Sequence, residues 1–173
     1  MPPVPLRRES PLRGRRLRLD EVLLERFAMS RVGLQFLLKV APRIDKAVIP
    51  RTKGRLSATG IDKVGLVTTT GAKSGERRTQ PLALIDDGDG LIAIASNYGR
   101  SSHPAWSYNL EAHPECQVEY RGPVATYRAE RLEGEERARA WTTAVDFYAG
   151  YERYRVTSAP RVIKVYRLRP TGA

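Results

Sequence analysis

The sequence is poor in the residues that bind metal ions and form covalent cross-links. It contains one cysteine and two histidines in 173 residues. A single cysteine cannot form an intramolecular disulfide, and this usage favours a reducing compartment. Cys116, His103 and His113 are together too few for an ordinary zinc site. We therefore expect neither a metal ion nor a disulfide framework.

Long apolar runs and an acidic excess are also missing. No stretch approaches the ~20 apolar residues of a membrane-spanning helix. The arginine-rich start leads into Asp20 and Glu21 rather than into the apolar core of a signal peptide, so we expect a cytoplasmic protein. The formal charge of +11, from 30 Lys and Arg against 19 Asp and Glu, favours an anionic partner. Nucleic acid, an anionic membrane surface and a polyanionic small molecule all meet that requirement.

Composition divides the chain into three parts. Residues 1–19 hold six arginines and four prolines with little apolar surface, which predicts a basic disordered tail. Residues 20–55 are predicted to form an amphipathic helix, from Asp20 to about Val40, and a basic connector. Residues 1–40 could contact an anionic membrane at its inner face, although a helix that caps the barrel explains residues 20–40 equally well. Residues 56–173 are predicted to form one folded domain.

The part of the chain after Val64 has the texture of a β-rich domain. Segments rich in β-branched residues predict strands at 64–70, 79–86, 91–96, 116–120, 124–132 and 161–169. Helices are predicted at 104–112 and 135–148, the second with Ala138, Trp141, Val145 and Tyr148 on one face. The strand at 91–96 is mostly apolar, so we expect it to be buried on both faces. Six strands with few helices predict a mainly β, α+β fold built as a closed or partly closed antiparallel barrel.

The first motif runs from Thr68 to Arg78 and reads Thr-Thr-Thr-Gly-Ala-Lys-Ser-Gly-Glu-Arg-Arg. It is not a Walker phosphate loop, because Lys and Ser precede the second glycine and no helix pattern follows. The motif is predicted to lie at a hairpin tip, where free backbone N–H groups and the charges of Lys73, Arg77 and Arg78 could bind an anion. An ordinary solvated turn explains the same residues equally well.

Two further motifs have both a functional and a structural interpretation. The small residues of the loop at 97–102 permit a ligand to approach the backbone, and the helix start at Pro104 can bind an anion. The structural alternative places Trp106 in the core, which we favour, and bonds Asn109 to a loop carbonyl. Tyrosines at 148, 151 and 154 could form an aromatic wall, but their spacing alone fits a half-exposed helical face better.

Taken together, the motifs resemble the deazaflavin-dependent nitroreductase family, which includes F420H2-dependent quinone reductases. The resemblance spans about Val64 to Leu168. It rests on the first motif with Pro-Leu after it, and on Ala-Ser-Asn followed by His-Pro-x-Trp-x-x-Asn-Leu. It implies a split β-barrel of the FMN-binding-like type and an oxidoreductase that uses coenzyme F420. The acceptor of the hydride would be a small or lipophilic molecule: a quinone such as a menaquinone, a nitroaromatic or an activated enoate. The protein would supply binding and orientation.

The resemblance also implies which residues form the site. The cofactor's phosphate and tail would meet Lys73 and Arg78, beside Arg77, on a turn shaped by Ser74 and Gly75. The ring would lie along Pro81 and Leu82, under a loop with Ser96, Asn97 and Gly99, and the helix with His103, Trp106 and Asn109 would close the ribityl-phosphate side. Tyr148, Tyr151 and Tyr154 would line the acceptor pocket on a flexible segment. Ser96 and these tyrosines would orient the acceptor and donate a proton.

Two alternative functions remain beside this one. An FMN-binding split-barrel reductase would share the fold but would not need the Gly-x-Lys-Ser-Gly tail site. A non-catalytic basic nucleic-acid-binding module would explain the charge, but no helix-turn-helix or single-strand aromatic platform is present. We therefore expect a small-molecule acceptor as the partner, no nucleic acid, and a monomer or homodimer.

Overall fold

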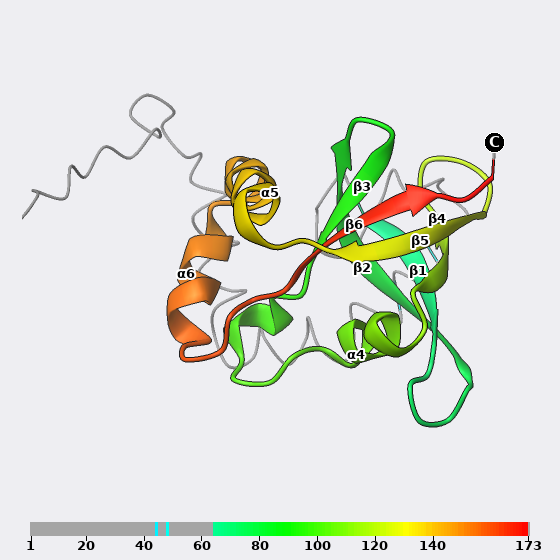
Figure 1. The fold of residues 1–173 in the computed structure, drawn as a ribbon, viewed down its shortest axis with the longest axis horizontal. Helices are drawn as coiled ribbons and strands as arrows, with labels where there is room; N and C mark the ends of the chain where they lie inside the picture. The colour runs from blue at the N-terminus through cyan, green and yellow to red at the C-terminus, as the bar shows by residue number, and fades with distance from the viewer. Residues whose placement is uncertain (1–43, 45–47, 49–63, 173) are drawn as a thin grey trace, which may run out of the picture.

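Antiparallel strands close into a six-stranded barrel in the computed structural model, which describes Ile44, Val48 and residues 64–172 (Figure 1). The strands are β1 (Val64–Thr70), β2 (Arg77–Asp87), β3 (Gly90–Ile94), β4 (Glu115–Glu119), β5 (Ala125–Arg131) and β6 (Val165–Pro170). The helices are α4 (Ala105–Ala112), α5 (Gly134–Phe147), α6 (Gly150–Thr157) and the short η1 (Asn97–Gly99). Around the barrel the order is β1-β2-β3-β6-β5-β4, and β4 also pairs with β1. The predicted α+β barrel is confirmed.

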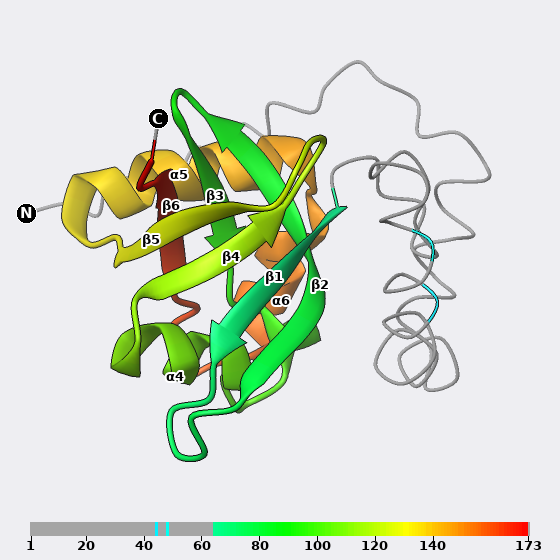
Figure 2. The same cartoon turned by 90° about the vertical axis from the view of Figure 1, so that its right-hand side faces the viewer.

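A long hairpin of β1 and β2 extends beyond the barrel at its lower end in Figures 1 and 2. At the tip, the Gly71 N–H donates to the Glu76 carbonyl at 2.8 Å, and the Gly75 N–H donates to the Gly71 carbonyl at 2.9 Å. Gly75 has a φ of +69°, which glycine adopts without a side-chain clash. The Ser74 hydroxyl accepts the Glu76 N–H at 3.3 Å. Ser74 and Gly75 therefore shape the turn.

The barrel interior forms the inner core, which α4 closes from below. Val67, Leu84 and Leu168 line it without exposed surface. Trp106 on α4 enters this core, and its ring centroid lies 5.5 Å from that of Tyr166. The prediction that Trp106 is a core residue is confirmed.

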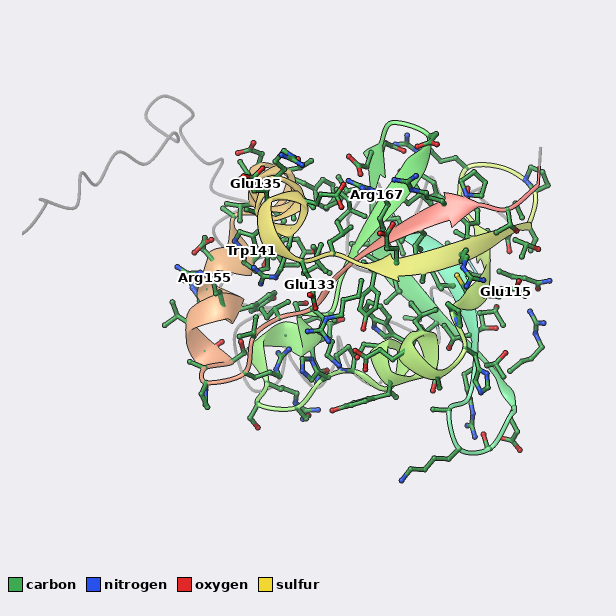
Figure 3. All side chains as sticks on the ribbon, viewed as in Figure 1. Glu115, Glu133, Glu135, Trp141, Arg155 and Arg167 are labelled. Atoms are coloured by element: carbon green, nitrogen blue, oxygen red, sulfur yellow. The ribbon has the colours of Figure 1, made fainter. Side chains whose placement is uncertain are left out.

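An outer core lies between the strand wall and two helices, and β3 separates the two cores. Side chains of β3 alternate between them, with Leu91 and Ala93 inside and Ile92 and Ile94 outside. This confirms the predicted burial of β3 on both faces. Helix α5 contacts β3 and β6 from outside (Figure 2). Where α5 meets α6, Trp141 of α5 (labelled in Figure 3) donates its Nε1–H to Glu152 Oε1 of α6 at 2.7 Å.

Most predicted elements differ from the structure only by a few residues at their ends, but three predictions differ in other ways. The last strand begins at Val165, not at Arg161, because residues 158–161 form a turn in which the Arg161 N–H donates to the Ser158 carbonyl at 2.9 Å. The segment that was predicted to be flexible is helix α6. Ala138 is exposed on α5, and Ala140 is buried in its place.

The predictions for the tail at 1–19 and for the helix and connector at 20–55 fall outside the described residues, apart from Ile44 and Val48. Within the described part of the chain, no helix is long and apolar enough to cross a membrane.

Candidate active site

The tip of the β1–β2 hairpin presents three exposed cationic side chains, from Lys73, Arg77 and Arg78. The Arg78 guanidinium pairs with the Glu76 carboxylate, and the two side chains are 61% and 66% exposed. Arg77 Nη2 donates to Gln117 Oε1 on β4. An ion pair as exposed as that of Arg78 contributes only about 0–1 kcal/mol. An anionic ligand could therefore displace it.

Asn109 on α4 anchors this hairpin. Its Nδ2 donates to Thr69 Oγ1 at 2.9 Å, and its Oδ1 accepts the Ala72 N–H at 3.0 Å. The expectation that Asn109 bonds a loop carbonyl is wrong, because the side chain accepts a loop N–H instead. Asn109 is 8% exposed and Trp106 4%. Asn109 therefore holds the hairpin through its polar atoms. Trp106 holds α4 against the barrel through its ring.

The strand β2 offers a buried donor next to the predicted ring site. Pro81 and Leu82 are half-buried. The neighbouring Gln80 has a buried Nε2 that finds no hydrogen-bond acceptor within the described part of the chain. A buried donor left unpaired costs about 1–3 kcal/mol. A ligand with a hydrogen-bond acceptor along this strand would remove that cost.

The loop that joins β3 to α4 has an unusual backbone. Asn97, Tyr98 and Gly99 have φ values of +48°, +54° and +73° in succession. Non-glycine residues rarely adopt this region, Tyr less often than Asn. Gly99 packs tightly on α6, since a Cβ there would lie 2.1 Å from Thr157 Oγ1 and 3.2 Å from Tyr154 Cα. The loop is therefore tightly packed against α6.

Arg161, which sequence reasoning missed, holds this loop. Its Nη1 donates to the Ala95 carbonyl at 3.1 Å, its Nη2 to the Ser96 carbonyl at 2.8 Å, and its Nε to the Arg100 carbonyl at 2.9 Å. Nothing in the sequence indicated the three carbonyl partners.

His103 lies beside the same guanidinium, with its Nδ1 3.2 Å from Arg161 Nη1. Burial lowers the pKa of His103, and the charges of Lys164 and Arg161 lower it further. Lys164 is itself paired with Glu111 at 2.7 Å. His103 is therefore a neutral imidazole near pH 7.

The three tyrosines meet in one cluster, which also includes Tyr98. Ring centroids lie 5.4 Å apart for Tyr148 and Tyr151, 6.0 Å for Tyr148 and Tyr154, and 6.3 Å for Tyr98 and Tyr154. Tyr151 and Tyr154 are only 6% and 5% exposed, whereas Tyr148 is half-buried. The Tyr148 and Tyr154 hydroxyls are 3.5 Å apart. Tyr98 is half-buried as well, so Tyr148 and Tyr98 are the partly exposed members of this cluster.

Burial raises the pKa of Tyr151 and of Tyr154. Both hydroxyls stay protonated at ordinary pH, so they can donate hydrogen bonds but cannot act as bases. The glycine of this segment, Gly150, has a packing role: a Cβ there would lie 2.3 Å from Tyr148 Cζ. The segment that was expected to be flexible is therefore in close contact with the Tyr148 ring at Gly150.

Other parts of the described surface offer less. Residues 64–172, with Ile44 and Val48, contain no group of three or more His, Cys, Asp and Glu side chains that could hold a metal ion. A hollow of about 230 Å³ lies beside Arg131, Arg137 and Lys164, away from the hairpin. Its cations are already bonded: Arg137 to the Ile163 carbonyl, and Arg131 and Lys164 to Glu111.

Comparison with known proteins identifies the family. The model of the family described as F420H2-dependent quinone reductase matches residues 41–169. The chain belongs to the F420H2-dependent quinone reductase family. The closed barrel and the basic hairpin tip agree with the fold and the anionic cofactor of this family.

Individual relatives of the reductase support this result. An F420H2-dependent quinone reductase of Mycobacterium tuberculosis is 33% identical over 97 residues, which are 55% of this chain and 62% of that relative. A solved structure described as an F420-H2 dependent reductase is 36% identical with a TM-score of 0.57, over 61% of this chain and 93% of that chain. Another, described as a domain-swapped dimer, is 30% identical with a TM-score of 0.58, over 73% and 96%.

Family membership makes this reductase an oxidoreductase whose cofactor is coenzyme F420 rather than FMN. The residues present fit that group. The hairpin tip of Lys73, Arg77 and Arg78 suits a polyanionic tail. The unpaired Gln80 Nε2 suits a ring system that carries hydrogen-bond acceptors.

Proposed function

We propose that this chain uses F420H2 to reduce a quinone, at the end of the barrel that lies between the hairpin tip and α6. One observation carries the proposal: hydrogen bonds and packing contacts connect the elements involved. Asn109 joins α4 to the hairpin at Ala72, and α4 continues back into the loop whose Gly99 packs on Tyr154. The hairpin tip, α4, the β3–α4 loop and α6 therefore lie one after another along the lower side of the barrel in Figure 1.

The cofactor would be held by charge at one end and by shape at the other. Lys73, Arg77 and Arg78 would make charge-assisted hydrogen bonds to its anionic tail. Half-buried Pro81 and Leu82 would support its flat ring. When bound, the reduced deazaflavin supplies the hydride, and the protein supplies orientation and electrostatics.

The acceptor would lie on the side of the loop and α6. Ser96 and Asn97 would orient it by hydrogen bonds, while Gly99 keeps the loop close to α6. The half-buried Tyr148 would donate a hydrogen bond or proton, with the protonated Tyr154 hydroxyl 3.5 Å behind it. Such positioning is what brings reacting atoms to about 3–3.5 Å. Nitroaromatics and activated enoates are flat acceptors of the same kind.

We also propose a peripheral location at the inner face of the membrane, where a menaquinone could be reached. The support is in the sequence: 15 of the 30 Lys and Arg, but only 6 of the 19 Asp and Glu, precede Val64. Polybasic segments are attracted to anionic lipid.

The oligomeric state is a separate question, and light scattering distinguishes the monomer from the homodimer.

Titration of the purified apoprotein tests the function. Coenzyme F420 should bind and FMN should not, as followed by the absorbance of each ligand. Reduced F420 should then be oxidised when a soluble naphthoquinone is added, and only in the presence of the protein. Preferential binding of FMN, or no quinone-dependent oxidation, would overturn the proposal.

A further inference from the structure

One guanidinium spans the whole loop between β3 and α4. The three nitrogens of Arg161 donate to carbonyls on both sides of the positive-φ residues, Ala95 and Ser96 before them and Arg100 after them. The loop has only two backbone bonds across its tip, from the Gly99 N–H to the Ser96 carbonyl at 3.0 Å and from the Arg100 N–H to the Asn97 carbonyl at 3.1 Å. Asn97 Nδ2 adds a side-chain bond to the Ser102 carbonyl at 2.9 Å. Arg161 therefore adds three hydrogen bonds from outside the loop to those that the loop makes within itself.

The backbone of this loop needs such support. Residues held in sparsely populated φ/ψ regions persist only where their surroundings fix them. Tyr98, with a φ of +54°, is the most constrained of the three, because it has a bulky side chain in the left-handed region. Its ring packs edge-on against Tyr154 at 6.3 Å. That ring contact and the guanidinium together hold a conformation that the chain would otherwise leave.

The position of Arg161 is itself fixed by its own turn. The Arg161 N–H donates to the Ser158 carbonyl at 2.9 Å. The Ser158 hydroxyl is fully buried and lies 3.2 Å from the Arg161 carbonyl and 3.3 Å from the Arg155 carbonyl. The guanidinium therefore extends from an anchored backbone.

From these contacts we infer that Arg161 is a positioning residue of the reaction, which sets where Ser96 and Asn97 meet the acceptor. The part played by the loop rests on the proposed function; the clamp on the loop does not. The role requires arginine, because only a planar guanidinium can donate to three carbonyls in fixed directions at once. Lysine would keep the positive charge but could not donate to all three carbonyls on both sides of the loop.

The clamp also fixes the proton of His103. A guanidinium has donors and no acceptor, so the Nδ1 that faces Arg161 Nη1 at 3.2 Å must be the acceptor. The neutral imidazole then carries its proton on Nε2. This consequence can be measured in the wild-type apoprotein, without cofactor and without any substitution.

The test compares Arg161→Lys with Arg155→Lys. Arg155 lies on the outer side of α6 (Figure 3), where it pairs with Glu152 at 2.8 Å, so the control makes the same chemical change at an exposed site. In the apoprotein variant Arg161→Lys, the amides of Gly99 and Arg100 should exchange with solvent about tenfold faster or more, while the barrel amides stay protected. With cofactor, kcat/KM for a soluble naphthoquinone should fall about 10–100-fold, with affinity for F420 within about threefold.

The outcomes separate the two claims. Wild-type exchange rates at Gly99 and Arg100 in Arg161→Lys, or a wild-type His103 with its proton on Nδ1 by nitrogen NMR, would overturn the clamp. Faster loop exchange with unchanged kcat/KM would uphold the clamp and overturn its role in the reaction. If no quinone is reduced even by the wild type, the proposed function fails and the apoprotein exchange still decides the clamp.

Discussion

Arg78 and Glu76 form an ion pair at the hairpin tip, and both charges bear on an anionic cofactor. Arg78→Ala should weaken F420 binding ~10–100-fold at low salt, because a charge-assisted bond contributes about 1.5–3 kcal/mol. Glu76→Gln should strengthen binding, since it removes a competitor for Arg78 and a like charge. Both effects should shrink at high salt, where charges are screened.

Fluorescence titration at two salt concentrations measures these changes. The control is Arg139→Ala on α5, which also removes an arginine from an exposed ion pair, here with Glu135. Equal affinity of the wild type and Arg78→Ala at low salt would contradict the assignment of the tail site.

Cys116 gives a second prediction for a single residue. Burial raises the pKa of this thiol from 9.0 to about 11, which lowers the thiolate fraction at neutral pH about 100-fold. Ellman's reagent should therefore react at least ~100-fold more slowly with the native protein than with the denatured protein. Cys116→Ser supplies the blank. A native rate close to the denatured rate would mean that the barrel opens readily.

The same shift has a consequence for stability. The folded pKa of Cys116 lies above the unfolded value. Its contribution to the free energy of unfolding is therefore fully present below pH 9.0 and is lost as the pH rises through about 11. Tyr120, whose pKa burial raises to about 12, acts in the same direction at higher pH.

At the scale of elements, α6 is where the site differs most from the sequence prediction. Tyr151 and Tyr154 belong to the outer core, so replacing either by Ala costs about 3–5 kcal/mol of stability. Substitution by Phe keeps the packing. Tyr148→Phe and Tyr154→Phe should leave F420 affinity nearly unchanged and lower turnover most for acceptors that need a hydrogen bond or proton.

Steady-state kinetics with several acceptors, together with melting temperatures, tests this. Tyr127→Phe on β5 makes the same change away from α6 and should alter neither quantity. If both variants reduce every acceptor at the wild-type rate, the tyrosines have only a structural role.

The strands and the hairpin were predictable because they depend on local patterns. β-branched runs, glycines and the Asp/Gly turn that ends β2 mark them along the chain. Helix α6 was not predictable from the sequence. Residues 150–157 include one Gly, two Tyr, one Val and one Thr, all of which have low helix propensity. Its contacts with η1 and α5 stabilise it instead.

The role of Arg161 was equally beyond sequence patterns. Its carbonyl partners lie 61 to 66 residues away along the chain. An expected strand at 161–169 pointed to an ordinary alternating side chain. The β3–α4 loop, by contrast, was placed correctly from its small residues, although its positive-φ backbone was not expected.

For the whole molecule, charge is distributed unevenly. Residues 64–172 contain 15 Lys and Arg against 13 Asp and Glu, and several of these are paired, such as Arg167 with Asp87 at 2.8 Å. The basic excess therefore belongs mainly to the residues before Val64. This distribution disfavours a nucleic-acid-binding barrel.

Deletion of residues 1–18 should reduce co-sedimentation with vesicles that contain phosphatidylglycerol, because six arginines are removed. Binding to phosphatidylcholine vesicles should be weak before and after the deletion. Turnover of a soluble naphthoquinone should be unchanged, which serves as the control for folding. Equal sedimentation with both kinds of vesicle would contradict the electrostatic attachment.

The two cores contain one tryptophan each, Trp106 inside the barrel and Trp141 beside Tyr151, with ring centroids 6.3 Å apart in the second pair. Trp106 shares α4 with the asparagine that anchors the hairpin, and Trp141 donates to α6. Replacing either by Phe leaves a single emitter. The two ends of the site thus carry built-in optical reporters, so that events at the hairpin and at α6 can be timed separately without an attached dye.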